Sequence, residues 1–267
     1  NNNTISNNTI NDNGISLSDC INITLFNNNL LDSIIIFDGD SIEEYDSHNI
    51  DVSNTVNGRS VYYIKNQEGG TVPEDAGQII LVNCTGMTIE NQNANILLAF
   101  CSGNRIQNNM ISNDYGISLS SSDNNMISNN TINENGISLS SSDNNMISNN
   151  TITDSYQGIS LSSSNNNTIS NNTINGDYGY MSFGISLWSS DNNNFNNNIV
   201  NSSLMGIFLE SSRNIIFRNN SFRNKIIFGL CISLSINVTL VDNVFNVTLV
   251  DNVFNATNGF YIYGDSI

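Results

Sequence analysis

Hydrophobic residues recur along this chain in columns that repeat about every 21 residues. The isoleucine of the recurring segments MIS and TIS marks one column, a second follows it by five residues, and two more precede it by eight and ten. A period of this length is typical of solenoids, in which each repeat forms one turn that stacks on the next. The marker column contains Ile5, Leu25, Ile89, Ile106, Ile127, Ile147, Ile169, Phe195, Phe217 and Leu240.

Within one repeat the apolar positions alternate with polar ones, as Ile117 and Leu119 do. Alternation with a period of two predicts short strands with one buried face, and no segment shows helical spacing. We therefore predict an all-β solenoid with three short strands per turn, in which equivalent residues of neighbouring turns lie roughly 4.8 Å apart. The segment SSDNNMISNNTI occurs unchanged at 121–132 and 141–152, as expected if a turn that stacks well is copied.

Asparagine makes up about a fifth of the chain, and one asparagine column follows the marker column by three residues. An asparagine side chain carries both donors and acceptors, so asparagines stacked at a corner can hydrogen-bond to one another and to the backbone. Asparagine also tolerates the left-handed conformation that corners often need. We predict a structural ladder of Asn8, Asn28, Asn109, Asn130, Asn150, Asn172, Asn198, Asn220 and Asn243.

The net charge of −17 narrows the range of possible binding partners. Nucleic acid is excluded as an expected partner because phosphate binding needs a basic surface. No apolar run approaches the roughly 20 residues of a membrane-spanning helix, so we expect no membrane span in this chain.

The motif NNTISNNTI followed by GISLSSS resembles the right-handed parallel β-helix repeat of NosD-like proteins, also called the carbohydrate-binding and sugar-hydrolase (CASH) repeat. Residues 54–92 resemble a block of the surface β-helix proteins of methanogenic archaea. The resemblance implies one right-handed β-helix domain over residues 1–267, with roughly ten to thirteen turns. It is weak for function, because such proteins include copper-system accessories, sugar-active enzymes and plain surface proteins.

The period breaks at about residues 31–77, where acidic residues gather in what we interpret as an insertion or a set of irregular turns. Insertions in a solenoid map to loops on one face, often the binding face. Asp38, Asp40, Glu43 and Glu44 are the candidate ligands for calcium, which prefers carboxylate and carbonyl oxygens. The competing interpretation is a solvated acidic loop.

Two cysteines, Cys84 and Cys101, fall on adjacent turns in a column otherwise occupied by serine. Small stacked free thiols are one interpretation of this column. A disulfide between Cys84 and Cys101 is the other, since the spacing of neighbouring turns permits the bond.

Many Asn-x-Ser/Thr sequons occur, but a chain so rich in these residues gives about as many by chance. Four of them precede a ladder asparagine at a corner and are the candidate glycosylation sites: Asn129, Asn149, Asn171 and Asn219.

The sequence shows no clustered carboxylates along the regular turns and gives no catalytic residues. We expect a non-enzymatic extracellular or cell-surface protein of a surface layer, sheath, filament or adhesin. It requires no cofactor, and calcium is the one candidate ligand. Expected partners are further copies stacked head to tail through uncapped ends, glycans or other envelope proteins. The alternative is a carbohydrate-binding or sugar-cleaving β-helix that uses the acidic insertion.

Overall fold

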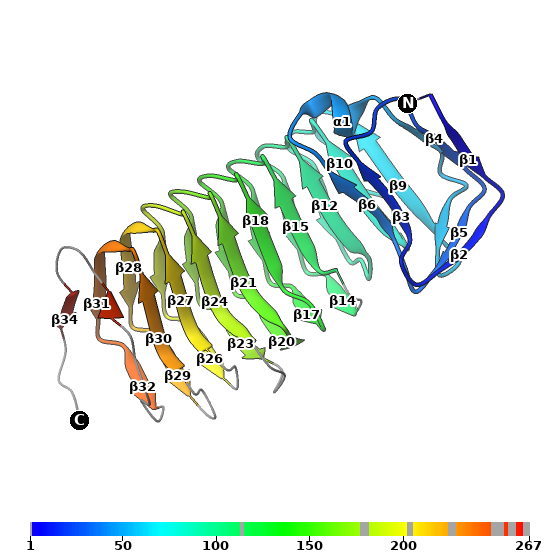
Figure 1. Cartoon of the computed structure of the whole chain (residues 1–267). Coiled ribbons are helices and arrows are strands. Elements are labelled where there is room, and N and C mark those ends of the chain that lie inside the picture. The colour runs from blue at the N-terminus through cyan, green and yellow to red at the C-terminus, as the bar shows by residue number, and fades with distance from the viewer. Residues whose placement is uncertain are drawn as a thin grey trace.

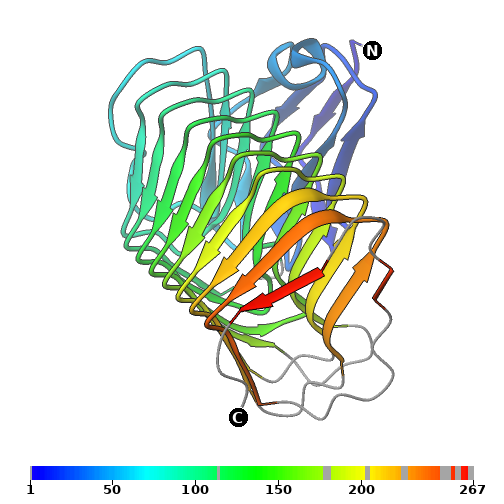
Figure 2. The same ribbon diagram turned by 90° about the vertical axis from the view of Figure 1, so that its left-hand side faces the viewer.

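The chain forms an elongated β-solenoid (Figure 1). The computed structural model describes residues 2–112, 115–176, 182–201, 205–223, 228–246, 254–255 and 260–263. The solenoid has about ten turns of about 22 residues each, as the hydrophobic period predicts. Figure 2, in which the C-terminal end faces the viewer, shows the successive turns stacked one behind another, so equivalent residues form columns along the axis.

The strands build five sheets in the described part of the chain. The largest sheet has 13 strands: β2 (Thr9–Asn11), β5 (Asn29–Leu31), β8 (Thr55–Val56), β9 (Arg59–Lys65), β10 (Gln78–Val82), β12 (Asn95–Ala99), β15 (Ile117–Ser120), β18 (Ile137–Ser140), β21 (Gln157–Ser162), β24 (Phe183–Trp188), β27 (Met205–Glu210), β30 (Phe228–Ser233) and β33 (Phe254–Asn255). The second sheet comprises β11 (Thr88–Glu90), β13 (Arg105–Gln107), β16 (Met126–Ser128), β19 (Met146–Ser148), β22 (Thr168–Ser170), β25 (Asn194–Asn196), β28 (Arg213–Arg218), β31 (Ile236–Val241) and β34 (Phe260–Tyr263). The third comprises β14 (Met110–Ser112), β17 (Thr131–Asn133), β20 (Thr151–Ser155), β23 (Thr173–Gly176), β26 (Ile199–Asn201), β29 (Ser221–Arg223) and β32 (Val244–Asn246). Two small sheets contain β1 (Thr4–Ser6), β4 (Thr24–Phe26) and β7 (Asn49–Ile50), and β3 (Ile15–Ser18) and β6 (Ile35–Asp38).

The asparagine ladder is present, and the bonds between its side chains all run in one direction. The side-chain nitrogen of Asn130 donates to Oδ1 of Asn150 on the next turn (2.9 Å) and to the backbone oxygen of Ile106 on the previous turn (3.0 Å). The backbone nitrogen of Asn130 donates to the same Oδ1 atom (3.0 Å). Each interior asparagine thus uses both donors and both lone pairs of its amide oxygen while almost completely buried. The ladder bonds join Asn8 to Asn28, Asn28 to Asn54, Asn109 to Asn130, Asn130 to Asn150, Asn150 to Asn172, Asn172 to Asn198, Asn198 to Asn220 and Asn220 to Asn243.

Each corner contains two consecutive asparagines, one with a left-handed backbone and one in the ladder. The sequence had suggested that a single asparagine serves both purposes. Asn149 is exposed and adopts a left-handed backbone (φ 56°), while Asn150 beside it is buried in the ladder. Because a short polar side chain enters the left-handed region at little cost, the first asparagine turns the chain and the second bonds the turns. The dipeptide NN therefore supplies both the residue that turns the chain and the residue that hydrogen-bonds to the next turn.

Two further columns use the same design. Asn125 donates to Asn145 as a second asparagine ladder (3.2 Å), and Asn124 before it has a φ of 57°. In the serine column the backbone nitrogen of Ser122 donates to Oγ of Ser142 (3.0 Å). The second ladder consists of Asn104, Asn125, Asn145, Asn167 and Asn193, and the serine column of Ser122, Ser142, Ser164, Ser190, Ser212 and Ser235.

The solenoid is not one continuous coil, because the chain reverses at residues 57–58. Strands β8 and β9 form the only antiparallel pair among the described strands, joined by Asn57 and Gly58, which both have positive φ. An Asn-Gly pair with left-handed geometry at both positions is the preferred two-residue hairpin turn. We call residues 2–57 the N-terminal stack and residues 59–263 the main stack. The segment 31–77, predicted as an insertion or a set of irregular turns, comprises the last part of the N-terminal stack, the reversal and the first part of the main stack.

Each stack has its own hydrophobic core, and β10 is the wall between them. Ile79 and Leu81 face the core of the main stack, while Ile80 and Val82 face the core of the N-terminal stack, so all five residues of β10 are buried. A strand buried on both faces loses the alternation that marks a half-exposed strand. The N-terminal stack therefore packs against the outer face of the main stack, at the blue end in Figure 1.

The ladder also stops at this junction. Asn54 donates to the backbone oxygens of Leu25 (2.9 Å) and Asp51 (2.7 Å), which ends the N-terminal ladder. Gln92 begins the main ladder: its Oε1 accepts from the Ala76 amide (3.2 Å) and its Nε2 donates to the Pro73 oxygen (3.0 Å). The side chain of Gln92 thus pairs with the backbone of the segment before it, where the main ladder begins.

We predict that Asn150→Ala lowers the free energy of unfolding by about 3 kcal/mol or more, because it leaves the backbone and side-chain donors of Asn130 buried without an acceptor. Denaturant titration followed by circular dichroism measures the change. The matched control is Asn149→Gly, which removes an exposed side chain and keeps the left-handed backbone. Equal effects of the two substitutions would contradict the assignment of the ladder to the second asparagine.

Candidate functional site at the junction of the two stacks

The acidic residues proposed for calcium lie around a short helix, α1 (Ile42–Asp46), in the N-terminal stack. Glu44 forms a capping box: its Oε2 accepts from the amides of Asp40 (3.0 Å) and Ser41 (2.9 Å) and from the Ser41 hydroxyl (2.8 Å). The Ser41 hydrogen bonds also hold the pKa of Glu44 below its ordinary value. A carboxylate used in this way starts a helix.

The calcium hypothesis for Asp38, Asp40, Glu43 and Glu44 is not supported by this geometry. No three His, Cys, Asp or Glu side chains gather as a possible metal site in the residues described above. Calcium needs about six or more oxygen ligands, and Glu44 already has three donors on one oxygen. We therefore interpret this acidic segment as a capped turn.

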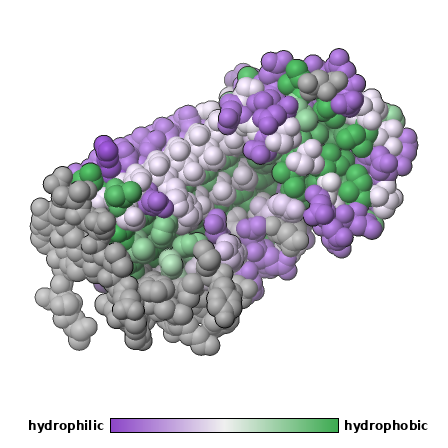
Figure 3. All heavy atoms as spheres, viewed as in Figure 1, coloured by the Kyte–Doolittle hydropathy of each residue, from purple (hydrophilic) through white to green (hydrophobic). Residues whose placement is uncertain are grey.

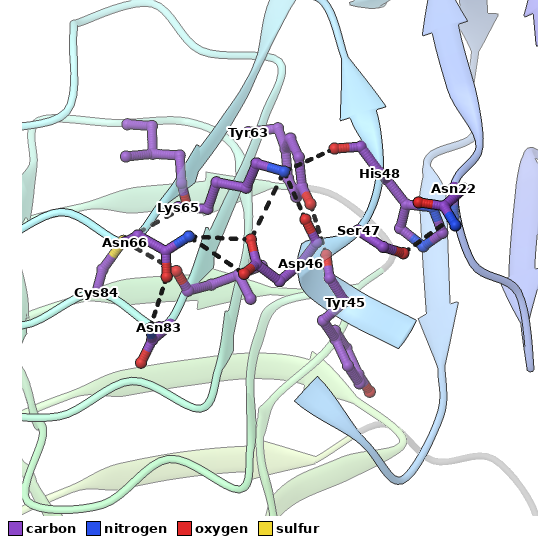
Figure 4. A network of polar contacts seen from close by, with 12 residues as sticks. Asn22, Tyr45, Asp46, Ser47, His48, Tyr63, Lys65, Asn66, Asn83 and Cys84 are labelled. Atoms are coloured by element: carbon purple, nitrogen blue, oxygen red, sulfur yellow. Dashed lines mark hydrogen bonds and ion pairs between the residues drawn. The ribbon is translucent and has the colours of Figure 1, made fainter. Parts of the chain in front are cut away.

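A polar network joins α1 to β9 and holds the two stacks together (Figure 4). The Lys65 ammonium donates to the backbone oxygens of Asp46 and His48 and lies 3.6 Å from the Asp46 carboxylate. The Asn66 amide donates to both Asp46 carboxylate oxygens (3.1 and 3.2 Å). Backbone carbonyl oxygens at the end of α1 thus accept hydrogen bonds from the facing strand. The last carbonyl groups of a helix have no partner within the helix, and these bonds supply one.

His48 is buried within the N-terminal stack and is held in one neutral tautomer. Its Nε2 donates to the Glu44 backbone oxygen (2.7 Å), and its Nδ1 accepts from the Ile23 amide (3.2 Å). Burial is the main cause that lowers the pKa of His48, and the nearby charge of Lys65 lowers it further. Protonation of Nδ1 would place a second donor against the Ile23 amide and break this bond.

A cleft of about 310 Å³ is lined by residues of both stacks. Its floor includes Asn95 at the start of β12, whose side chain is 4% exposed and whose Oδ1 has no hydrogen-bond partner among the described residues. A buried amide oxygen without a donor is unfavourable, so this atom marks a place where a ligand group would be stabilised. The cleft is lined by Asp32, Ser33, Ile34, Val56, Asn57, Arg59, Asn95, Ser112, Tyr115 and Glu134.

Both sides of the junction contribute to the cleft, which explains why sequence reasoning missed it. Asp32 and Arg59 come from the segment that breaks the period, while Tyr115 and Glu134 lie in the connections that lead into β15 and β18. These residues come from parts of the chain that are far apart in the sequence, and they line one cleft because the chain reverses at 57–58. The Asn-Gly pair at the reversal was the one available signal.

The disulfide considered between Cys84 and Cys101 is not present in the structure, where both are free thiols. The two residues replace serines in the serine column: Cys84 donates to the Val82 oxygen and Cys101 to the Ala99 oxygen (3.3 Å each). The Cys84 amide donates to Sγ of Cys101 (3.4 Å). The hydrogen bond between the two side chains, together with burial, raises the pKa of the Cys101 thiol, and the same hydrogen bond lowers the pKa of Cys84 to about 7.

The four candidate glycosylation asparagines, Asn129, Asn149, Asn171 and Asn219, are all exposed at left-handed corner positions. Their side chains are accessible, and glycosylation itself stays a prediction.

Comparison with known proteins establishes the family. A family model described as "right handed beta helix region" matches residues 74–222 and 133–267, and the chain therefore belongs to the right-handed β-helix family. A more specific NosD-like or CASH assignment is not shown by these matches. No curated protein matches the sequence.

Solved β-helix structures show a distant likeness to this chain. A double mutant of the periplasmic alginate epimerase AlgG superposes with a TM-score of 0.52 at 14% identity, over 96% of this chain and 85% of that chain. The mannuronan C-5 epimerase AlgE6 A-module of Azotobacter vinelandii gives a TM-score of 0.46 at 14% identity, over 97% and 81%. At such identity the likeness shows the fold alone. In the described residues, no helix is long and apolar enough to cross a membrane.

We predict that the N-terminal stack becomes less stable as pH falls below about 6.5, the ordinary histidine pKa. The folded state binds a proton on His48 only at lower pH than the unfolded state does, so unfolding takes up a proton in this window and the free energy of unfolding decreases with falling pH. Hydrogen exchange at the Ile23 amide between pH 7.5 and 5.5 measures the effect.

The control for this prediction is His48→Asn, whose amide oxygen replaces Nδ1 as an acceptor and does not titrate. It should remove the pH dependence within this window. The pKa values of Glu44 and Asp51 are lowered, so their contributions are lost only as pH falls through the ordinary carboxylate range. An unchanged slope in His48→Asn would show that another group is responsible.

Proposed function

We propose that this protein is a non-enzymatic structural component of an extracellular or cell-surface assembly, such as a surface layer, sheath, filament or adhesin. The observation that supports this proposal best is the set of unbroken side-chain ladders, which tie every turn of the main stack from Gln92 to Asn243 to its neighbours. Stacked turns whose polar groups are all hydrogen-bonded form a stiff rod, which suits a structural component of an assembly.

The outer faces of the strands fit the same role. Ser118, Ser138 and Ser160 form one outward column of the largest sheet, and Ser120, Ser140 and Ser162 form another. Figure 3 shows a pale band of intermediate hydropathy along the main stack, and hydrophobic residues gathered over the N-terminal stack. Small polar columns give a flat surface along which a neighbour can lie.

We propose further that the rods assemble along their axes. Strands β1, β2 and β3 each pair on one side only within the described residues. An unpaired strand edge is a template for another strand. In the assembled material these edges are occupied by β-structure that continues the same columns, either of a longer chain or of a second copy.

A second candidate function, carbohydrate binding or sugar cleavage by the irregular segment, is favoured by one observation. The lining of the cleft between the stacks includes Asp32 and Arg59 of that segment together with Glu134 of the main stack. A pair of carboxylates is also what glycoside hydrolysis uses.

We predict that the purified chain forms elongated particles that lengthen with concentration. Light scattering and negative-stain electron microscopy measure the particle mass and length. The variant Ile10→Lys places a charge on the edge strand β2, where Ile10 is half-buried, and should stop lengthening. The control Ser138→Lys adds the same charge to an exposed outer column. Monodisperse monomers at every concentration would refute axial assembly.

A further inference from the structure

We propose that the cleft between the N-terminal and main stacks is a binding site for a neutral saccharide. This inference deepens the second candidate function and rests on it. It is independent of axial assembly. The argument uses the unpaired amide of Asn95, the balance of charge around the cleft, and its mixture of polar and apolar walls.

The unpaired oxygen of Asn95 is unusual in its surroundings. Gln78, its neighbour on the same outward column one turn earlier, pairs completely: its Oε1 accepts from the Ile35 amide (2.9 Å) and its Nε2 donates to the Ile35 oxygen (2.7 Å). Those two bonds attach β6 to the main stack. Asn95 faces the same junction and finds no donor in the described residues. A ligand hydroxyl that donates to this oxygen would relieve the cost of its burial.

The charges around the cleft disfavour an anionic or a metal ligand. Arg59 lines the cleft together with two carboxylates, Asp32 and Glu134, in a chain with a net charge of −17. Its contact with Asp75 is 4.0 Å long and the Asp75 side chain is 83% exposed, so guanidinium donors remain for a ligand. Alternating acceptors and donors suit vicinal hydroxyl groups, which both donate and accept.

The walls of the cleft suit a sugar ring, which has polar hydroxyl groups at its edge and an apolar face. Ile34 and Val56 are buried walls from the N-terminal stack, and the Tyr115 side chain is 38% exposed at the opposite side. Aromatic rings with a polar tip contribute contact area with few side-chain torsions to fix. The volume of about 310 Å³ lies at the lower end of the range of ligand pockets, roughly 300–1,000 Å³, so the site holds a small saccharide or the end of a chain.

The test is a titration of the full chain, by calorimetry and saturation-transfer NMR, with glucose, galactose, mannose, N-acetylglucosamine and their disaccharides, and with glucuronate as an anionic probe. We expect at least one neutral saccharide to bind saturably and more tightly than glucuronate. The proposal is overturned if no saccharide saturates the protein at concentrations up to about 10 mM, because any binding would then have a free energy weaker than about −3 kcal/mol. Tighter binding of glucuronate also overturns it.

Matched variants locate the site. Tyr115→Ala should weaken binding at least tenfold, whereas Tyr156→Ala, an exposed tyrosine two turns further along, should leave it unchanged. Asn95→Ala should weaken binding about 3- to 10-fold, the equivalent of one hydrogen bond. Glu134→Gln should weaken it, and its column neighbour Asp154→Asn should not. Equal effects in the cleft variants and their controls would place binding elsewhere and refute the assignment. Rod length in the same variants reports on assembly independently.

Discussion

The structure depends on a hydrogen bond between the side chain at a corner and the equivalent corner of the next turn. A solenoid of short strands exposes many backbone groups where strands end, and an unpaired buried amide costs about as much as a lost hydrogen bond. The buried columns of Asn and Ser solve this problem by supplying an acceptor to the backbone nitrogen of the preceding turn, as Asn150 does for Asn130 and Ser142 does for Ser122. The hydrophobic columns can then fill the interior without a polar defect at every corner.

This constraint explains the composition. Each corner needs one residue that turns the chain and one that bonds to the next turn, so the dipeptides SS and NN recur. Asn129 and Ser121 have positive φ, while Asn130 and Ser122 are buried and bonded. Cys101 can replace a serine in the serine column because its sulfur accepts a hydrogen bond from the Cys84 amide, as the serine hydroxyl oxygens do from the preceding turn. The unusual asparagine content is therefore a consequence of the number of corners.

The hydrophobic period and the ladder were predictable because they repeat, and repetition lets a weak local pattern be averaged over many turns. Leu119 and Asn130 could be assigned from their columns alone. The reversal at 57–58 occurs once and disrupts the period on both sides, although Asn57-Gly58 is a strong hairpin pattern. Glu44 was assigned to calcium because its sequence context is acidic, whereas the Ser-x-x-Glu spacing from Ser41 fits a capping box. Asn95 and Tyr115 could not be linked to Arg59 without the three-dimensional path of the chain.

The ladders also have a polarity. In each ladder the side-chain nitrogen of one asparagine donates to the side-chain oxygen of the asparagine on the later turn, so one direction along the axis presents acceptors and the other presents donors. The two directions along a ladder are thus chemically unlike. Two rods that met by identical ends would place acceptor against acceptor or donor against donor. Two-fold symmetric joining through the ladder is therefore unfavourable, and a fibre built on it would have a direction that every subunit shares.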